Sequence, residues 1–397
     1  MTAFLNALGV ICALGADRAQ VSRSLFAGDC SGVRAEAGWV PERQLPVAAV
    51  RVELPALPDT CAAHESRNNR LLLAAAHQIE TELREAIGRY GATRVGIVLG
   101  TSTSGIDEAS RGIKTYLQDQ RFPDSYDYRQ QELGSPANCL ADWLQSSGPA
   151  YVISTACTSS ARALMSARRL LDMGLCDAVI CGGVDTLCQL TLNGFSALEA
   201  ISEQRCNPFS RHRNGINIGE AAALFLMSRD DQGPGIALLG EGASSDAHHI
   251  SAPDPQGLGA IAAMRQALQR AQLGPEQIDY LNLHGTATVH NDAMESLAVQ
   301  AVFPAGVPCS STKPLSGHTL GAAGALEAAF CWLALCADNR DSVLPPHVWD
   351  AQPDPQLPSL NLIDTHARLP QGKARRLMSN SFAFGGNNVS LILGDAP

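Results

Sequence analysis

The strongest constraint on the fold is an alternation of strand and helix patterns that occurs twice along the 397 residues. Short apolar runs rich in Val, Ile and Leu, such as residues 94–99 and 278–283, predict buried strands, and helical patterns separate them. Such alternation is typical of layered α/β folds. Its repetition predicts a duplicated α/β unit, with one half at residues 1–233 and the other at 234–397, packed around shared buried helices.

The individual elements follow from the same patterns. Helices are expected at residues 18–27, 69–90, 194–201, 261–273 and 322–335, and strands at 94–99, 177–183, 222–227, 278–283, 307–311, 377–381 and 389–393. Residues 3–15 predict a first strand and turn. Residues 35–65 lack periodicity and predict a surface excursion. Residues 107–147 predict an insertion that covers a pocket or meets a partner.

The composition indicates a globular enzyme and argues against several other classes. A net charge of −10 without a dense run of Lys or Arg disfavours nucleic-acid binding. No apolar run reaches roughly 18 residues, so no membrane span is expected. The twelve cysteines are scattered without a CxxC pair, which favours a reducing, cytoplasmic setting and indicates no metal-ligand set.

Cys157 lies where a predicted strand turns into a predicted helix. Residues 150–153 are apolar, residues 154–160 are mostly small, and helical spacing follows. At a helix N-terminus, free N–H groups and the helix dipole favour a thiolate over a thiol. Most cysteines in a chain like this are buried structural thiols. The tight turn and two histidine motifs make Cys157 the candidate nucleophile instead.

Two histidines occupy matching glycine-rich turns in the second half. His284 follows a predicted strand in Leu-His-Gly-Thr-Ala-Thr, and His318 ends the run Thr-Lys-Pro-Leu-Ser-Gly-His. Lys313 is expected to keep the His318 imidazole neutral and to anchor a carboxylate, with Glu327 of the next helix as its buried partner. A single histidine, or a single Lys–Glu pair, is often structural. Two such turns together with a candidate cysteine favour catalysis.

One cysteine with two imidazoles suits a particular chemistry. The sulfur can accept an acyl group as a thioester, and two neutral imidazole N–H groups can stabilise an enolate oxygen. Such an enolate forms when a malonyl thioester loses CO2, and it can then attack the acyl group. A hydrolytic Cys-His pair needs only one histidine and an Asn or Asp that orients it.

These motifs resemble the β-ketoacyl-[acyl-carrier-protein] synthases. The resemblance rests on Thr-Ala-Cys157-Thr-Ser-Ser, His284-Gly-Thr-x-Thr, Lys313-x-x-x-Gly-His318 and the Phe-rich loop at residues 380–388, and it covers nearly the whole chain. It implies a duplicated thiolase-like α-β-α-β-α fold and a dimer. It also implies decarboxylative Claisen condensation of an acyl thioester with malonyl-carrier protein, without a metal or redox cofactor, on substrates held by phosphopantetheine.

The resemblance assigns roles to individual residues. Cys157 would accept the acyl group, and His284 and His318 would promote decarboxylation. The N–H groups of Cys157 and Phe384 would form the oxyanion hole, and Phe384 would gate the acyl pocket. The remaining implied residues bind substrate or brace the histidine loop: Thr286 and Thr288 on the phosphopantetheine arm, Phe382, Gly385 and Gly386 in the Phe-rich loop, and Asp292 and Glu295 as braces.

Two further motifs suggest a subgroup and its partners. Residues 100–105 and 206–209 look closest to synthases of bacterial aryl-polyene pigment clusters. Such synthases pair with a chain-length-factor homologue that lacks the nucleophile, so a heterodimer or a homodimer is implied. The acyl carrier protein is acidic, which predicts a basic rim at the tunnel mouth. The candidate arginines are Arg67, Arg70, Arg205, Arg211 and Arg213.

Three alternatives remain open from the sequence. A housekeeping type II fatty-acid elongation synthase would share every motif. A thiolase would need a second catalytic cysteine near the C-terminus, and no cysteine follows Cys336. A non-catalytic chain-length subunit would tolerate loss of the nucleophile or of a histidine. In this sequence Cys157, His284 and His318 are all present.

Overall fold

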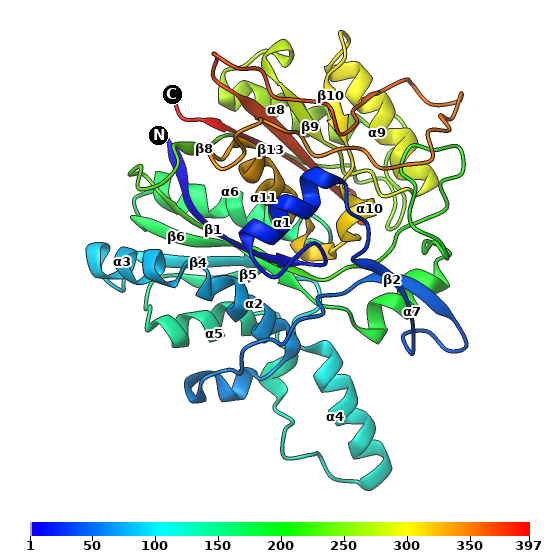
Figure 1. Ribbon diagram of the computed structural model, residues 1–397. Coiled ribbons are helices and arrows are strands. Elements are labelled where there is room, and N and C mark those ends of the chain that lie inside the picture. The colour runs from blue at the N-terminus through cyan, green and yellow to red at the C-terminus, as the bar shows by residue number, and fades with distance from the viewer. Residues whose placement is uncertain (1) are drawn as a thin grey trace.

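The computed structural model describes residues 2–397 and has one large mixed sheet that crosses the molecule (Figure 1). Its eleven strands lie in the order β11-β10-β9-β12-β13-β8-β1-β7-β6-β4-β5. The strands of the first half are β1 (Ala3–Cys12), β4 (Val95–Gly100), β5 (Ala150–Ile153), β6 (Ala178–Asp185) and β7 (Ala221–Ser228). Those of the second half are β8 (Ile236–Ser245), β9 (Tyr280–Asn282), β10 (Pro308–Ser310), β11 (Asn361–Leu362), β12 (Arg376–Ala383) and β13 (Asn387–Asp395).

The two halves have the same strand topology. In the first half the strands lie side by side in the order β1-β7-β6-β4-β5. If the five strands are numbered along the chain within this half, the order is 1-5-4-2-3. The second half repeats this order in β8-β13-β12-β9-β10, with β11 added at the edge. The halves join where β1 pairs with β8 through Ala3 with Leu238 and Phe4 with Ala237. The predicted duplication is therefore confirmed.

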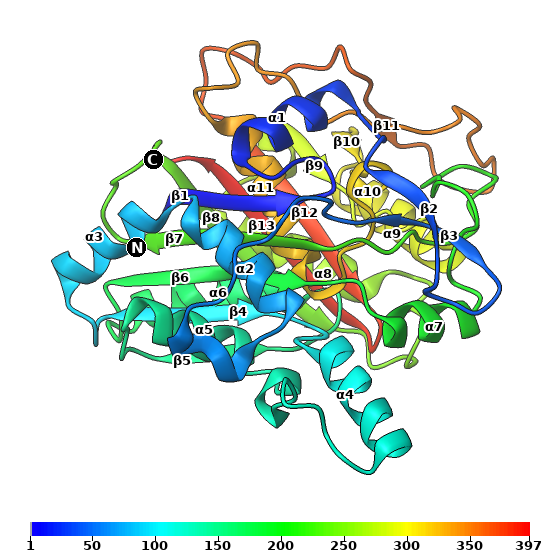
Figure 2. The ribbon, with the colours of Figure 1, turned by 60° about the horizontal axis from the view of Figure 1, so that its bottom comes forward.

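Helices pack on both faces of each half-sheet, which gives five layers (Figure 2). The central layer contains α6 (Ser159–Asp172) and α11 (Ala323–Leu335), which share one hydrophobic cluster with strands from both halves. Separate clusters lie beneath the two outer layers. The outer helices are α2 (Arg67–His77), α3 (Glu80–Tyr90) and α5 (Ser135–Leu144) on one side, and α8 (Leu258–Ala271) and α9 (Val289–Val302) on the other. The predicted α-β-α-β-α layering is confirmed.

The central helices approach each other closely because Gly324, in the first turn of α11, has no side chain. A Cβ atom at position 324 would lie 2.7 Å from the Cβ of Ala161 in α6. Every residue of α11 is buried, in keeping with its Ala-rich, apolar sequence. This contact fixes α6, which starts just after Cys157, against the helix that follows the His318 loop.

Two predicted elements have different boundaries in the structure. The helix expected at residues 69–90 is broken into α2 and α3, because the Gln78 amide pairs with both the N–H and the C=O of Val10 in β1. The strand expected to end at Gly183 continues to Asp185. A side chain at Gly183 would place its Cβ 2.5 Å from that of Ser160, so glycine there permits contact with α6 rather than ending the strand.

The remaining elements lie outside the layers. The predicted surface excursion contains a two-stranded hairpin, β2 (Val33–Ala37) with β3 (Gln44–Ala48). The helix α1 (Arg18–Ala27) matches its prediction, and α7 (Gln189–Ala197) begins earlier than expected. The helix α4 (Ile106–Asp119) projects from the body in both views (Figures 1 and 2). Among the described residues, no helix is long and apolar enough to cross a bilayer.

Candidate active site

Cys157 lies in a tight turn between β5 and α6. Ala156 before it has a left-handed φ of 52°, which a non-glycine residue adopts only when its surroundings enforce it. The Ser159 hydroxyl closes the turn, since its Oγ accepts the Thr155 N–H at 2.9 Å and donates to the Ala156 carbonyl at 2.5 Å. The predicted strand–turn–helix setting of Cys157 is confirmed.

Both histidines reach this sulfur from the second half of the chain. The Nε2 atom of His318 lies 2.9 Å from the Sγ of Cys157. The ring of His284 meets that of His318 edge to face, with centroids 5.3 Å apart. One ligand-type atom from each of the three side chains lies within 4.8 Å of the others. His284 and His318 follow Cys157 by 127 and 161 positions in the sequence, yet they form one buried cluster with it.

The two imidazoles are neutral at physiological pH. Burial, and secondarily the nearby Lys313 ammonium, hold the pKa of His284 and of His318 well below the usual value. The Lys313 Nζ lies 3.4 Å from the Nδ1 of His284. Since an ammonium only donates hydrogen bonds, this Nδ1 accepts, and the His284 proton resides on Nε2. His284 is therefore held as an N–H donor at Nε2.

Lys313 forms a buried ion pair with Glu327. Both side chains are almost fully buried, and neither lines the cavity described below. The predicted pairing is confirmed, but the predicted contact is not. Lys313 was expected beside His318, which is close in sequence. Instead Lys313, the first residue of the short helix α10 (Lys313–Ser316), contacts His284 in the loop after β9.

Cys157 is a thiol at rest. Burial raises its pKa to about 12, and the Lys313 ammonium offsets only part of this effect. The expected resting thiolate is thus wrong, although the sulfur does sit at the N-terminus of α6. The thiolate forms only as the sulfur attacks, when hydrogen bonds and the incoming carbonyl compensate for desolvation.

The raised pKa predicts the pH dependence of alkylation. The rate at which iodoacetamide alkylates Cys157 should rise about tenfold for each pH unit between about pH 7 and pH 9, because the thiolate fraction grows throughout this range. Site-resolved mass spectrometry measures the rate, and a small free thiol with a pKa of about 8.5 serves as the control because its rate levels off. A Cys157 rate that reaches its plateau near pH 7 would show that the helix N-terminus outweighs burial.

Two buried carboxylates brace the His284 loop, as the resemblance implied. Glu295 accepts the N–H groups of His284 and Gly285 at 2.8 and 2.7 Å. Asp292 accepts the N–H of Ala287 at 3.2 Å. Burial raises the pKa of Glu295 to about 7 and that of Asp292 to about 6. Both residues contact backbone rather than the cavity, so they position the loop.

Asp185 is a structural anchor that the sequence reasoning missed. Its fully buried carboxylate accepts hydrogen bonds from the Thr101 and Thr103 hydroxyls and from the N–H of Gly321, at 2.6 to 2.8 Å. It therefore ties the loop after β4 to the loop that follows His318. A charged residue at the end of the otherwise apolar run 178–184 was the signal that could have revealed it.

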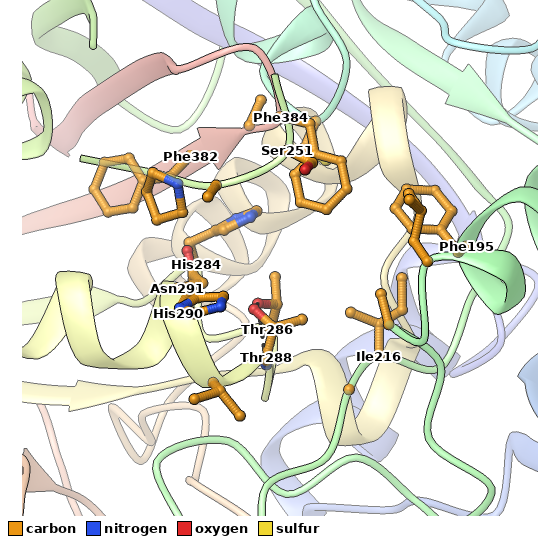
Figure 3. Close-up of a pocket in the computed structure, with 18 of the residues that line it drawn as sticks. Phe195, Ile216, Ser251, His284, Thr286, Thr288, His290, Asn291, Phe382 and Phe384 are labelled. Atoms are coloured by element: carbon orange, nitrogen blue, oxygen red, sulfur yellow. Dashed lines mark hydrogen bonds between the residues drawn. The ribbon is translucent and has the colours of Figure 1, made fainter. Parts of the chain in front are cut away.

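A cavity of about 690 Å³ opens in front of the three side chains (Figure 3). Cys157, His284 and His318 line its inner end. The predicted substrate-binding residues Thr286, Thr288 and Phe382 also line it, as does Phe384, the predicted gate. Figure 3 shows both threonines and both phenylalanines around one central space. A volume of this size suits a small-molecule substrate, and the lining offers both apolar and polar side chains to it.

The glycines of the Phe-rich loop have a different place from the one predicted. Gly385 and Gly386 do not line the cavity but form the turn between β12 and β13, with φ values of 82° and 75°. The Gly385 N–H donates to the Ile250 carbonyl and the Gly386 N–H to the Ala383 carbonyl. Neither bond uses the N–H of Phe384, which stays a predicted member of the oxyanion hole. The Phe384 ring packs against Phe195, with centroids 5.6 Å apart.

Several predicted docking arginines are occupied by partners within the chain. Arg67 binds the fully buried Glu220, and Arg213 is itself buried in an ion pair with Asp354. Arg70 pairs with Glu65. Arg205 and Arg211 are exposed but do not line the cavity. The rim of the described cavity is therefore less basic than the sequence suggested.

The insertion at residues 107–147 does not cover this cavity. None of the described residues that line the cavity belongs to it. Instead α4 and the following turn expose Tyr116, Leu117 and Phe122 on the projection. Of the two expectations for this insertion, covering the pocket is wrong, and contact with a partner stays a prediction.

The cluster of one sulfur and two imidazoles has the composition of a soft-metal site. The tautomer of His284 opposes that use. Because Lys313 donates to the Nδ1 of His284, the proton of this imidazole is on Nε2, the nitrogen that faces the cluster. A metal ion would have to displace that proton. The arrangement suits hydrogen-bond donation to a developing oxyanion better than metal ligation.

Comparison with known proteins agrees with this geometry. A family model described as "Beta-ketoacyl synthase, N-terminal domain" matches residues 59–232, and one described as "Beta-ketoacyl synthase, C-terminal domain" matches residues 237–348. Nodulation protein E of Rhizobium meliloti (strain 1021) is 30% identical over 98% of this chain and 97% of its own. 3-oxoacyl-[acyl-carrier-protein] synthase 2 of Coxiella burnetii is 30% identical over the same shares of the two chains.

A solved structure is more similar still. It is the ketosynthase ApeO in complex with its chain length factor ApeC from Xenorhabdus doucetiae, which is 48% identical, covers 100% of this chain and 98% of the other, and superposes with a TM-score of 0.93. The two relatives each cover 98% of this chain, and the Cys-His-His cluster lines its cavity. The chain belongs to the β-ketoacyl synthase family of condensing enzymes.

Proposed function

We propose that Cys157 carries the growing acyl chain and that His284 and His318 generate and hold the malonyl-derived enolate that attacks it. The observation that carries this assignment is the convergence of the sulfur and both neutral imidazoles at the inner end of one cavity. The sulfur can take the acyl group as a thioester, and the two imidazoles can donate hydrogen bonds to the enolate oxygen.

In the first half-reaction, Sγ attacks the carbonyl carbon of an acyl thioester. The His318 Nε2–H, 2.9 Å from Sγ, donates to the sulfur as negative charge develops there. The bond from the carbonyl carbon to the sulfur of the incoming arm breaks. The thiol proton of Cys157 passes to that departing sulfur, so the arm leaves as a free thiol and the acyl group stays on the enzyme.

In the second half-reaction, a malonyl thioester occupies the cavity with its carbonyl oxygen between the two imidazoles. The C–C bond to the carboxylate breaks, CO2 leaves, and the electron pair forms an enolate. The Nε2–H groups of His284 and His318 donate to the enolate oxygen. The enolate carbon then attacks the acyl-Cys157 carbonyl, and the bond from that carbon to the sulfur breaks as the β-keto product forms. The sulfur takes up one proton from solvent and returns to the thiol.

The substrates arrive on the phosphopantetheine arm of acyl carrier protein, and the chemistry uses no redox cofactor or metal. The hydroxyls of Thr286 and Thr288 lie 2.9 Å apart and line the cavity, where amide groups of such an arm can pair with them. The free, unbridged cysteines in the described chain suit the reducing cytoplasm as the site of this reaction.

We place this protein in aryl-polyene-type pigment biosynthesis, as the catalytic partner of a chain-length-factor homologue. Support comes from its 48% identity to a ketosynthase solved with its chain length factor. The exposed apolar residues of the α4 projection and the edge strand β5 provide surface for a second subunit. A housekeeping fatty-acid synthase is the alternative, and the product formed with a native partner distinguishes the two. We also propose that the halves meet at residues 233 and 234.

The assignment predicts that each histidine is needed more for decarboxylation than for acyl transfer. His284→Ala and His318→Ala should each lower malonyl decarboxylation by about 100-fold or more, because each removes a donor to the enolate oxygen. Acylation of Cys157 should fall by about tenfold or less. Release of CO2 from malonyl-carrier protein and intact-protein mass measure the two steps separately.

The exposed His77 of α2 supplies the matched control, since His77→Ala removes an imidazole far from the cavity. It should leave both steps at the wild-type rate. Decarboxylation at the wild-type rate in His284→Ala or His318→Ala would remove that histidine from the proposed mechanism.

A further inference from the structure

His347 is a buried histidine that takes no part in the half-reactions described above. It is 6% exposed and does not line the cavity. Its Nδ1 lies 3.1 Å from the backbone nitrogen of Ser311, and its Nε2 lies 3.2 Å from the carbonyl oxygen of Pro208. The ring therefore bridges two segments that are distant in the sequence.

The two contacts fix the tautomer of His347. A backbone N–H only donates, so Nδ1 accepts from Ser311, and a carbonyl oxygen only accepts, so the ring proton is on Nε2. Burial lowers the pKa of His347 to about 4, which keeps the ring neutral at physiological pH. A neutral imidazole offers one acceptor and one donor on the same rigid ring, which suits it to join these two backbone groups.

The segments that His347 bridges enclose Gly285, the residue after His284. A Cβ atom at position 285 would lie 2.5 Å from the Cβ of Ser311 and 2.9 Å from the ring of Phe209. The Ser311 hydroxyl also donates to the Gly285 carbonyl at 2.7 Å. The backbone at Gly285 is thus packed closely on both sides, so a shift of either segment moves it.

The same two segments carry further supports of the His284 loop. The Ser311 hydroxyl oxygen lies 3.4 Å from the backbone nitrogen of Lys313, whose ammonium contacts His284. The Phe209 N–H donates at 2.8 Å to Asp292, one of the two carboxylates that brace the loop. The imidazole that bridges these segments is therefore joined to the His284 loop by two routes.

We propose that His347 is a positioning residue for decarboxylation, because it holds Ser311 and Pro208 at a fixed separation. The two segments then keep the Nε2–H of His284 directed at the enolate oxygen. This role rests on the proposed function, which makes that N–H group a donor. His347 acts through the backbone at Gly285, since its own ring does not line the cavity.

His347→Phe keeps a ring at this position but removes both hydrogen bonds. The kcat for release of CO2 from malonyl-carrier protein should fall about tenfold, since a displaced donor stabilises the enolate less. KM should change less than about twofold. Acylation of Cys157 uses His318 rather than His284 and should stay within about threefold of wild type. Loss of folded protein would instead lower both rates together and leave the ratio of decarboxylation to acylation unchanged.

Two amide variants separate the contacts and keep the proposal testable if His347→Phe does not fold. The amide oxygen of His347→Asn can take the place of Nδ1 and accept the Ser311 N–H, whereas the longer amide of His347→Gln can donate to the Pro208 carbonyl. Because Ser311 contacts Gly285 directly, His347→Asn should restore kcat to within about threefold of wild type, and His347→Gln should resemble His347→Phe. A wild-type ratio of decarboxylation to acylation in His347→Gln would overturn the proposal.

His64→Phe is the matched control. His64 is also buried, contacts the Ser135 hydroxyl through Nδ1 at 2.9 Å, and does not line the cavity. This contact joins it to α5 rather than to either histidine loop, so the ratio of decarboxylation to acylation should stay at the wild-type value. An equal fall in the ratio for His64→Phe and His347→Phe would mean that any buried histidine has this effect, and would contradict the proposal.

The double variant His284→Ala/His347→Phe distinguishes positioning of His284 from damage elsewhere. If His347 acts through His284, the double variant should release CO2 within about twofold of the rate of His284→Ala alone. A further tenfold loss would overturn the proposal. If His284→Ala itself releases CO2 at the wild-type rate, the proposed function fails. If His284→Ala is slow and the His347 variants keep the wild-type ratio, the proposed function stands and His347 has no positioning role.

Discussion

Cys157→Ala is expected to abolish condensation, with a loss of at least about 1,000-fold in kcat/KM, because no other group in the cavity can carry the acyl chain as a thioester. The variant should show no mass increase on incubation with acyl-carrier protein. Malonyl decarboxylation should persist, since His284 and His318 remain in place and the smaller side chain only enlarges the cavity. Intact-protein mass spectrometry and product analysis measure these effects.

Cys30→Ala is the matched control for this variant. Cys30 is half-buried and lies away from the cavity, so its replacement should leave acylation and condensation at wild-type levels. A Cys157→Ala protein that still forms an acyl-enzyme would mean that another of the twelve cysteines is the nucleophile.

Lys313→Met is expected to lower the free energy of unfolding by about 3 to 5 kcal/mol, because it leaves Glu327 buried without its countercharge. It should also reduce decarboxylation, since the hydrogen bond that holds the proton of His284 on Nε2 is lost. Urea unfolding measures the first effect and CO2 release the second.

The double variant Lys313→Met/Glu327→Leu separates structure from catalysis. It replaces the ion pair with apolar side chains, so stability should recover to within about 1 to 2 kcal/mol of the wild type while decarboxylation stays low. Wild-type stability and activity in Lys313→Met would contradict the role given to this pair.

The stability loss in Lys313→Met should also depend on pH. Burial already raises the pKa of Glu327 above its ordinary value, and Lys313 opposes this shift, so removing the lysine raises the pKa further. A folded-state pKa above the unfolded one means that stability falls as pH rises, because folding then favours the protonated carboxyl. The loss should therefore be smaller near pH 6 than near pH 8.

The chemistry of the site was accessible from the sequence because it resides in short motifs. The small residues around Cys157 and the glycines beside His284 and His318 allow the backbone conformations that tight turns require. Each of these turns was found where it was expected. The duplicated alternation of strands and helices likewise predicted the layers, since periodicity records which face of each element is buried.

The parts that were missed depend on contacts between distant segments. Nothing in the helical periodicity of residues 69–90 reports that Gln78 hydrogen-bonds β1 and ends the helix. Arg213 looked like a free surface charge until the fold brought Asp354 to it. The contact of Lys313 with His284, rather than with His318, which is closer in sequence, likewise depends on how the fold brings distant segments together.

The position of α11 has a consequence for biosynthesis of the chain. This helix is apolar around its whole circumference and fills the space between the two half-sheets, where it covers the inner face of α6. The ribosome must therefore release residues up to Leu335 before the first half can hide that face. Until then, a nearly complete nascent chain exposes an apolar surface, which makes it a natural client for chaperones that hold apolar segments.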